Sequence, residues 1–400
     1  MLPTRFAAGL AIRGRMNPAF DAIIAGGGIV GAACAEACAG AGMRVALVER
    51  DVLGSGATAA GMGHIVVMDD SEAQFALTRR SQVMWGELAG RLPDSAEYET
   101  TGTLWIAADE EEMAEAARKR AFYAERGVPA RILSASELAG LEPNLRPGLA
   151  GALLVPEDAV VYPPAAALYL AREAERHGAT LIAGRSITKM GRGEAVLDDG
   201  TRLAAPRLIN AMGAWSPQMD AQIPVRKRKG HLVITDRYPG YVRHQLVELG
   251  YLKSAHSVGT DSVAFNVQPR KTGQILIGSS RQYGNESLAV DQHMLAAMLQ
   301  RAELYMPGIA RLQAIRVWTG FRAATPDKLP LIGPWRGDET LWLATGHEGL
   351  GITTALATAE LIAAAFTGAV PPIAPEPYLP ARYVRQNAHP DKESLCNGKV

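Results

Sequence analysis

Hydrophobic residues near the start of the chain form two short runs separated by a stretch of small residues. Residues 22–25 and 44–48 are mainly apolar, and residues 29–40 between them are mostly alanine and other small residues. A short apolar run bounded by turn residues is typical of a buried strand, and a longer stretch of small residues fits a helix packed closely on a sheet. Residues 20–50 therefore predict a strand–helix–strand unit.

The rest of the pattern predicts both helices and strands, and the middle of the chain differs from its two ends. Helical periodicity marks residues 71–92, 109–126, 163–177 and 352–366, and apolar runs predict strands at residues 103–107, 207–211 and 340–345. The middle holds three strand-like segments, residues 231–235, 262–268 and 273–278. In the second of these, Val263, Phe265 and Val267 alternate with small or polar residues, which predicts one apolar and one polar face.

Composition and charge narrow the class of protein. A length of 400 residues suggests roughly two domains, and a hydrophobic fraction of 48% is enough for a large core. The 41 basic residues balance the 41 acidic ones, so no net field favours nucleic acid or an anionic membrane. The basic run Arg226–Lys229 is interpreted as a solvated edge beside a strand rather than a nucleic-acid patch.

The three cysteines exclude several kinds of site. Cys34 and Cys38 lie four residues apart on the first predicted helix, where they are interpreted as small core residues, and Cys396 lies near the end. The sequence contains no disulfide framework, no zinc spacing and no iron–sulfur pattern. We therefore expect no metal in this chain and a reducing, cytoplasmic location.

The two ends of the chain are predicted to lie outside the folded domains. Residues 1–15 carry arginines around a short apolar patch and are interpreted as a leader without a structural role. Residues 381–400 are polar and are expected to form a loose tail. No stretch reaches the ~20 continuous apolar residues of a membrane span, which leaves peripheral association with a membrane possible.

The strongest chemical signal is a G-x-G-x-x-G turn between the first strand and the first helix. Gly26 allows the tight turn, Gly28 lets the backbone approach a pyrophosphate, and Gly31 allows the helix to pack closely on the strand. Glu49 ends the second strand, where its carboxylate can accept from ribose hydroxyls. This context predicts dinucleotide binding, with Ile29, Val30 and Arg50 as further contacts.

Three glycine-rich segments favour FAD over NAD. Residues 54–64 follow the ribose acid directly, and their small side chains allow close approach to a large ring system; a flexible surface loop is the alternative. Residues 208–216 run from a buried strand into a glycine turn, and residues 344–351 open the last helix, either as a flavin contact or as an ordinary cap. The candidate FAD contacts in these segments are Ala57, Thr58, Ala60, Gly61, Met62, Gly63, His64, Gly213, Trp215, Gly346, His347, Glu348, Gly349, Leu350, Gly351 and Ile352.

From about residue 20 to residue 380 the chain resembles the D-amino-acid oxidase, glycine oxidase and sarcosine oxidase superfamily of flavoproteins. Residues 318–333, Trp-Thr-Gly-Phe-Arg-Ala-Ala-Thr-Pro-Asp-Lys-Leu-Pro-Leu-Ile-Gly, carry the most specific motif, with Ala323 where a proline is common. The resemblance implies that Arg322 binds the substrate carboxylate. It also implies an amine oxidation in which a hydride passes from the substrate Cα to flavin N5.

The same resemblance implies an α/β fold (α+β overall), in which an antiparallel-sheet substrate domain interrupts a Rossmann-like FAD-binding domain. We divide the chain into an FAD-binding domain of residues 16–100, 151–222 and 318–380, and a substrate domain of residues 101–150 and 223–317.

A closer resemblance is to the beta subunits of D-hydroxyproline dehydrogenase and to the related flavoprotein subunits of hydrogen cyanide synthase and opine oxidase. It is carried by residues 60–64, 229–236, 262–270, 278–282 and 346–351. It implies that cis-4-hydroxy-D-proline or a related amino or imino acid is the substrate. It also implies a larger flavoprotein alpha subunit and a small iron–sulfur subunit as partners. The alternatives are a self-sufficient oxidase that produces hydrogen peroxide and a non-catalytic, FAD-bearing assembly subunit.

Six residues are candidates for the substrate pocket, each with an alternative interpretation. The planar guanidinium of Arg322 suits a carboxylate, or else a structural ion pair. Asn266 and Gln268 line a cavity or face solvent, and His64 lies over the flavin ring or is a satisfied loop histidine. Tyr251 and His256 lie in a segment that could cover the pocket. Because no cysteine lies near residues 322–333, we expect the FAD to be bound non-covalently.

Overall fold

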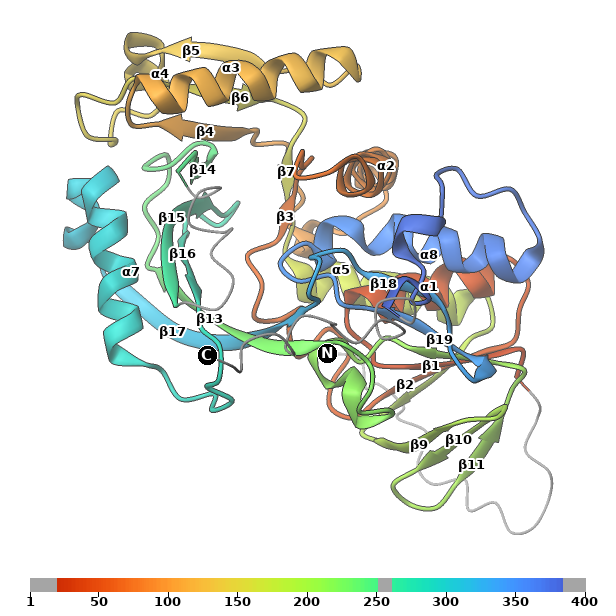
Figure 1. Cartoon of the computed structure of the whole chain (residues 1–400). Helices are drawn as coiled ribbons and strands as arrows, with labels where there is room; N and C mark the ends of the chain where they lie inside the picture. Colours follow the sequence, from red (N-terminus) through yellow and green to blue (C-terminus); the bar gives the residue numbers. More distant parts are fainter. Residues whose placement is uncertain (1–19, 251–260, 384–400) are drawn as a thin grey trace, which may run out of the picture.

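Two large β-sheets organise the chain in the computed structural model, which describes residues 20–250 and 261–383 (Figure 1). The first sheet has six strands, all parallel to their neighbours except for the antiparallel pair at one edge. In spatial order these strands are β18 (Leu331–Trp335), β19 (Asp338–Thr345), β12 (Arg207–Asn210), β1 (Ala22–Ala25), β2 (Val45–Glu49) and β8 (Thr180–Ala183).

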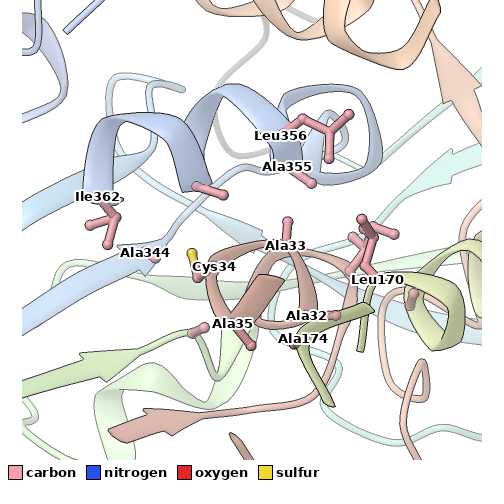
Figure 2. Close-up of a cluster of buried hydrophobic side chains, with 14 of the residues drawn as sticks. Ala32, Ala33, Cys34, Ala35, Leu170, Ala174, Ala344, Ala355, Leu356 and Ile362 are labelled. Atoms are coloured by element: carbon pink, nitrogen blue, oxygen red, sulfur yellow. The ribbon is translucent and has the colours of Figure 1, made fainter. Parts of the chain in front are cut away.

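Helices of small residues cover the six-stranded sheet. Helix α1 (Ile29–Gly40) contacts both α5 (Pro163–Arg176) and α8 (Gly351–Thr367), and α2 (Glu72–Ala89) packs on α8. Figure 2 shows Ala33 of α1 pointing toward Ala355 of α8, with Ala32 on the side of Ala174 of α5. Because each of these alanine side chains is a single methyl group, α5 and α8 can both pack closely against α1.

The second sheet has eight strands and is mostly antiparallel. In spatial order they are β17 (Ala314–Ala324), β13 (Arg226–Thr235), β16 (Ile275–Arg281), β15 (Ser262–Pro269), β14 (Gln245–Glu248), β4 (Thr103–Ala107), β6 (Gly151–Val155) and β5 (Arg131–Ser134). Helix α7 (Gln292–Tyr305) packs on β15 and β16, and α3 (Glu110–Glu125) and α4 (Ala135–Leu141) cover the β4–β6–β5 end.

Smaller elements complete the fold. A three-stranded sheet consists of β9 (Ile187–Gly191), β10 (Glu194–Leu197) and β11 (Arg202–Ala204), and a two-stranded one of β3 (His64–Ile65) and β7 (Ala159–Val160). Short 3-10 helices occupy Asp94–Ala96, Gly213–Gln218, Pro307–Arg311 and Glu376–Tyr378. None of the helices within residues 20–250 and 261–383 combines the length and apolar character needed to cross a membrane.

The mixed α/β fold predicted from the sequence is confirmed. The strand–helix–strand unit is β1–α1–β2, and Cys34 and Cys38 are buried in the core as expected. Burial raises the pKa of Cys38 to about 12 and that of Cys34 well above its usual value, so both thiols stay protonated.

All of strand β6 and residues 318–324 of β17 lie in the eight-stranded sheet, although our division assigned these residues to the FAD-binding segments. Strand β6 pairs with β4 and β5, and β17 pairs with β13 as far as Ala324. Strand β6 begins at a predicted boundary, and β17 runs across one. Pairing partners far away in the sequence, rather than local pattern, decide where such strands belong.

Of the two alternatives for the polar face of β15, exposure to solvent does not hold, because Asn266 and Gln268 are buried. Two local expectations need correction. The basic run is only partly a solvated edge, since Arg228 and Lys229 are buried on β13 while Arg226 is exposed. The tail is not loose from its first residue, because Arg382 donates to the Asp327 carboxylate; residues 1–19 and 384–400 lie outside the described residues.

We expect Ala32→Leu to lower the free energy of unfolding by about 1–3 kcal/mol, because the larger side chain overpacks the contact between α1 and α5. Denaturant titration of the purified protein measures this. The control is Ala114→Leu on the exposed face of α3, which should change stability by less than about 0.5 kcal/mol. Equal effects of the two variants would show that the α1 contact is not tight.

Candidate active site

A cavity of about 510 Å³ lies where the two large sheets meet. Its walls come from the ends of β1 and β2, the start of α1, the glycine-rich loop 54–64, the strands β13, β15, β16 and β17, and the residues that precede α8. Parallel sheets bind ligands beyond the carboxyl ends of their strands, and the cavity opens there.

The turn between β1 and α1 admits only glycine at two positions. Gly26 has φ +103°, and a Cβ there would lie 2.6 Å from the Ala211 carbonyl oxygen. A Cβ on Gly31 would overlap the carbonyl oxygen of Gly26. The N-cap residue Gly28 has no side chain to cap α1, and Oγ1 of Thr58 in the glycine-rich loop accepts from the Ile29 N–H at 2.9 Å. The start of α1, with its positive dipole end, lines the cavity. This geometry suits a pyrophosphate.

The Glu49 carboxylate fixes the neighbouring part of the cavity. Its Oε2 accepts from the Gly27 N–H at 2.6 Å and its Oε1 from the Asp51 N–H at 2.9 Å. A carboxylate has about four acceptor positions, so both oxygens have capacity left for ribose hydroxyls. Beside it, the Arg50 guanidinium lies 4.4 Å from the centre of the Trp215 ring, and both side chains line the cavity.

Contacts with distant elements fix the glycine-rich loop 54–64, which argues against a flexible surface loop. Gln268 on β15 donates from Nε2 to the Met62 carbonyl oxygen at 2.9 Å, and Thr353 on α8 donates from Oγ1 to the His64 carbonyl oxygen at 2.8 Å. A Cβ on Gly61 would lie 2.7 Å from Cδ1 of Ile352. The loop therefore forms a rigid wall between the two sheets.

The segment before α8 forms a further part of the wall, next to this loop. The N-cap residue Leu350 makes no side-chain cap, so the start of α8 offers its N–H groups toward the cavity. The Glu348 N–H donates to the Ala323 carbonyl oxygen at 2.8 Å, and the Glu348 carboxylate forms an ion pair with Arg228. Burial lowers the pKa of His347 to about 3, so this histidine is neutral beside Thr358.

Arg322 reaches the cavity from β17. Its Nη1 donates to the Ser280 carbonyl oxygen at 2.9 Å, and Ser280 is the acceptor that the guanidinium contacts among the described residues. A guanidinium has five N–H donors, so others are left for a carboxylate. Burial, together with the nearby charge of Arg228, lowers the pKa of Arg322 to about 9. The group stays charged at neutral pH, and a bound anion would stabilise it.

Three polar groups in the cavity wall have no hydrogen-bond partner among the described residues. They are Oδ1 of Asn266, Oγ of Ser279 and Nε2 of His64. Burial, with a contribution from the charge of Arg322, lowers the pKa of His64 to about 4, so its imidazole is neutral. Buried polar groups are almost always hydrogen-bonded in proteins, and unpaired ones around a cavity indicate that a polar ligand completes them.

The structure brings most of the predicted residues together around this cavity. The predicted residues that line it are Gly26, Gly28, Ile29, Val30, Glu49, Arg50, Ala57, Thr58, Ala60, Gly61, Met62, Gly63, His64, Gly213, Trp215, Asn266, Arg322, His347, Glu348, Gly349, Gly351 and Ile352. Gly31, Gly346, Leu350 and Gln268 do not line it. Gly31 packs on Gly26, Leu350 bonds His347 and Gln268 bonds Met62, so these three support residues that do, whereas Gly346 lies against Thr325. Tyr251 and His256 lie outside the described residues.

Several lining residues were not predicted. They are Ala25, Val48, Ser55, Gly56, Arg185, Ser186, Ile187, Ala211, Met212, Ala214, Gln218, Gly230, Leu232, Ser279, Gly320, Phe321 and Ala323. Two of them are glycines inside strands of the structure, β13 and β17, where a missing side chain marks a close approach. A Cβ on Gly320 would overlap Ala60, and one on Gly230 would overlap the Arg322 guanidinium.

The fold and the cavity define a dinucleotide-binding oxidoreductase. Residues 21–365 match the family described as DAO, FAD dependent oxidoreductase, and the chain belongs to that family. It is 29% identical to a glycine oxidase of Pseudomonas aeruginosa over 386 residues, which cover 90% of this chain and 98% of the relative. It is 27% identical to the hydrogen cyanide synthase subunit HcnC of the same species, with 92% and 97% of the two chains covered.

A solved structure supports the same assignment. The glycine oxidase of Geobacillus kaustophilus superposes with a TM-score of 0.81 at 26% identity, and the match covers 90% of this chain and 98% of that one. The cofactor is therefore FAD, and the residues present fit it. The glycine turn and the exposed start of α1 suit the pyrophosphate, Glu49 suits the ribose, and the fixed loop 54–64 and the start of α8 enclose the remaining space.

We expect acid precipitation of the purified protein to release its yellow flavin into the supernatant. The described cysteines, Cys34 and Cys38, are buried in the core away from the cavity lining, so no described thiol is placed to bond a flavin. Absorbance of the supernatant at visible wavelengths measures the released fraction. Colour that stays in the protein pellet would show a covalent link.

Proposed function

We propose that this chain is the catalytic subunit of a multi-subunit dehydrogenase that oxidises a D-amino or D-imino acid, with cis-4-hydroxy-D-proline as the best candidate. The observation that supports it most directly is the Arg322 guanidinium in the wall of the cavity. A planar, two-pronged donor suits a carboxylate. The likeness to one chain of a cyanide synthase supports a role within a larger assembly.

In this proposal the protein positions the substrate and organises charge. Arg322 holds the carboxylate, and Asn266 and the neutral His64 complete polar contacts around the rest of the substrate. The bound FAD supplies the hydride acceptor. The uncapped start of α8 stabilises negative charge in the cavity. The substrate amine must be neutral when the hydride leaves, and the excess of positive charge around Arg322 favours that neutral form.

A second candidate is a self-sufficient oxidase that passes electrons to oxygen and produces hydrogen peroxide. The 29% identity to a glycine oxidase favours it. A non-catalytic, FAD-bearing assembly role has less support, because it would not need a charged guanidinium and unpaired polar groups around the same cavity. The first two candidates differ in where the electrons go.

We expect Arg322→Lys to raise the concentration of a carboxylate substrate needed for half-maximal flavin reduction by about tenfold or more, because lysine cannot make the two-pronged contact. The FAD content should stay near that of the wild type. Anaerobic flavin bleaching measures both quantities. The control is Arg316→Lys, an exposed position on the same strand, which should behave like the wild type. An unchanged concentration dependence in Arg322→Lys would remove Arg322 as the anchor.

We expect cis-4-hydroxy-D-proline, or a related D-imino acid or opine, to bleach the flavin in the absence of oxygen. In air the peroxide yield should be low, and turnover with an artificial dye should be high, because the electrons normally leave through partner subunits. Parallel assays of oxygen uptake and dye reduction test this. Oxygen consumption as fast as dye reduction would make the oxidase the better assignment.

A further inference from the structure

We propose that His231 and Ser280 are positioning residues, which hold the Arg322 guanidinium in the orientation that receives a substrate carboxylate. This inference rests on the proposed function, since it deepens the role of Arg322. Neither His231 nor Ser280 lines the cavity, so both act through Arg322 and not on the substrate.

A continuous chain of hydrogen bonds connects the three residues across neighbouring strands. His231 lies on β13 and is fully buried. Its backbone N–H donates to Oγ of Ser280 on β16 at 2.9 Å, and its Nδ1 lies 2.9 Å from the same oxygen. The carbonyl oxygen of Ser280 then accepts from Nη1 of Arg322 at 2.9 Å. His231 therefore fixes Ser280 through two contacts, and Ser280 orients the guanidinium.

The contacts of His231 also fix its protonation state. The backbone N–H of Asp291 donates to Nε2 at 3.0 Å, so Nε2 must carry a lone pair. The single proton of the neutral ring is then on Nδ1, which donates to Ser280 Oγ. Burial lowers the pKa of His231, and the charges of Lys229 and Arg322 lower it further against the opposing effect of Asp291. The ring is therefore neutral and has one tautomer.

The space around the guanidinium makes its orientation sensitive to small movements. Gly230 precedes His231, and a Cβ there would overlap Nη1 of Arg322. On another side, a Cβ on Gly349 would lie 3.8 Å from Nε of Arg322. The guanidinium thus packs in a slot of backbone atoms, and a two-pronged contact with a carboxylate depends on its direction. A shift of Ser280 would turn the donors away from the substrate.

A pair of substitutions separates the two side-chain contacts of His231, which are Nδ1 with Ser280 and Nε2 with Asp291. His231→Asn places an amide N–H near the position of Nδ1 and retains the bond to Ser280. His231→Gln places an amide oxygen near the position of Nε2 and, of the two side-chain contacts, retains only the one with Asp291; the backbone N–H bond to Ser280 remains in both variants. We expect the substrate concentration for half-maximal anaerobic flavin reduction by cis-4-hydroxy-D-proline to rise about tenfold in His231→Gln and in Ser280→Ala. It should change less than about threefold in His231→Asn, and FAD content should not change in any variant.

A double variant tests whether His231 acts through Arg322. In the Arg322→Lys background, adding His231→Gln should have little further effect, because the contact that it positions is already gone. Additive effects, or equal behaviour of His231→Asn and His231→Gln, would overturn the inference. His293→Gln, on the exposed part of α7, is the control for a histidine substitution and should match the wild type.

Crystal structures of the wild type and His231→Gln test the same inference without any substrate. We expect the bond between Nη1 of Arg322 and the Ser280 carbonyl oxygen to be lost or displaced in the variant. An unmoved guanidinium in His231→Gln would overturn the positioning role, whatever the substrate is. If instead no amino or imino acid bleaches the wild-type flavin but the guanidinium moves, the proposed function fails and the positioning role stands.

Discussion

The whole structure is built around a close backbone contact between the turn after β1 and the first turn of α1. Gly31 of α1 packs against the carbonyl of Gly26 so closely that no side chain fits between them. This contact sets α1 directly on β1, and the small side chains of α1 then allow α8 and α5 to pack beside it (Figure 2). As a result, the starts of α1 and α8 both face one cavity, where their dipoles favour negative charge.

The second sheet contributes buried, charged side chains that are held on its strands. Arg228, Arg281 and Arg322 lie on three neighbouring strands, where the charge of Arg228 contributes to lowering the pKa values of the other two. Burial and the charges of the other two lower the pKa of Arg281 to about 8. Glu348 balances Arg228, and the remaining positive potential suits an anionic substrate beside a cofactor that gains negative charge on reduction.

The two sheets share the site because elements of each hold elements of the other. Gln268 on β15 and Thr353 on α8 both bond the loop that ends at His64. Gly320 on β17 lies against Ala60 of the same loop, and the Glu348 backbone bonds Ala323 of β17. These contacts cross from one sheet to the other. They therefore fix the part of the cavity wall that comes from the first sheet relative to the part that comes from the second. Preorganisation of this kind avoids the cost of ordering the site when ligand binds.

Local sequence was enough to predict the dinucleotide unit, because the spacing of Gly26, Gly28 and Gly31 before a small-residue helix is typical of this turn, and Glu49 follows at the end of the next strand. It also pointed to most of the cavity wall, since glycine-rich loops and the motif around Arg322 are local signals. Other features could be seen only in the folded chain: Gln268 supports the loop, Arg228 and Lys229 are buried, and His231 bonds Ser280, which in turn bonds Arg322. Each of these facts depends on strand pairing between residues far apart in the sequence, such as β13 with β17, and pairing of that kind leaves no local pattern.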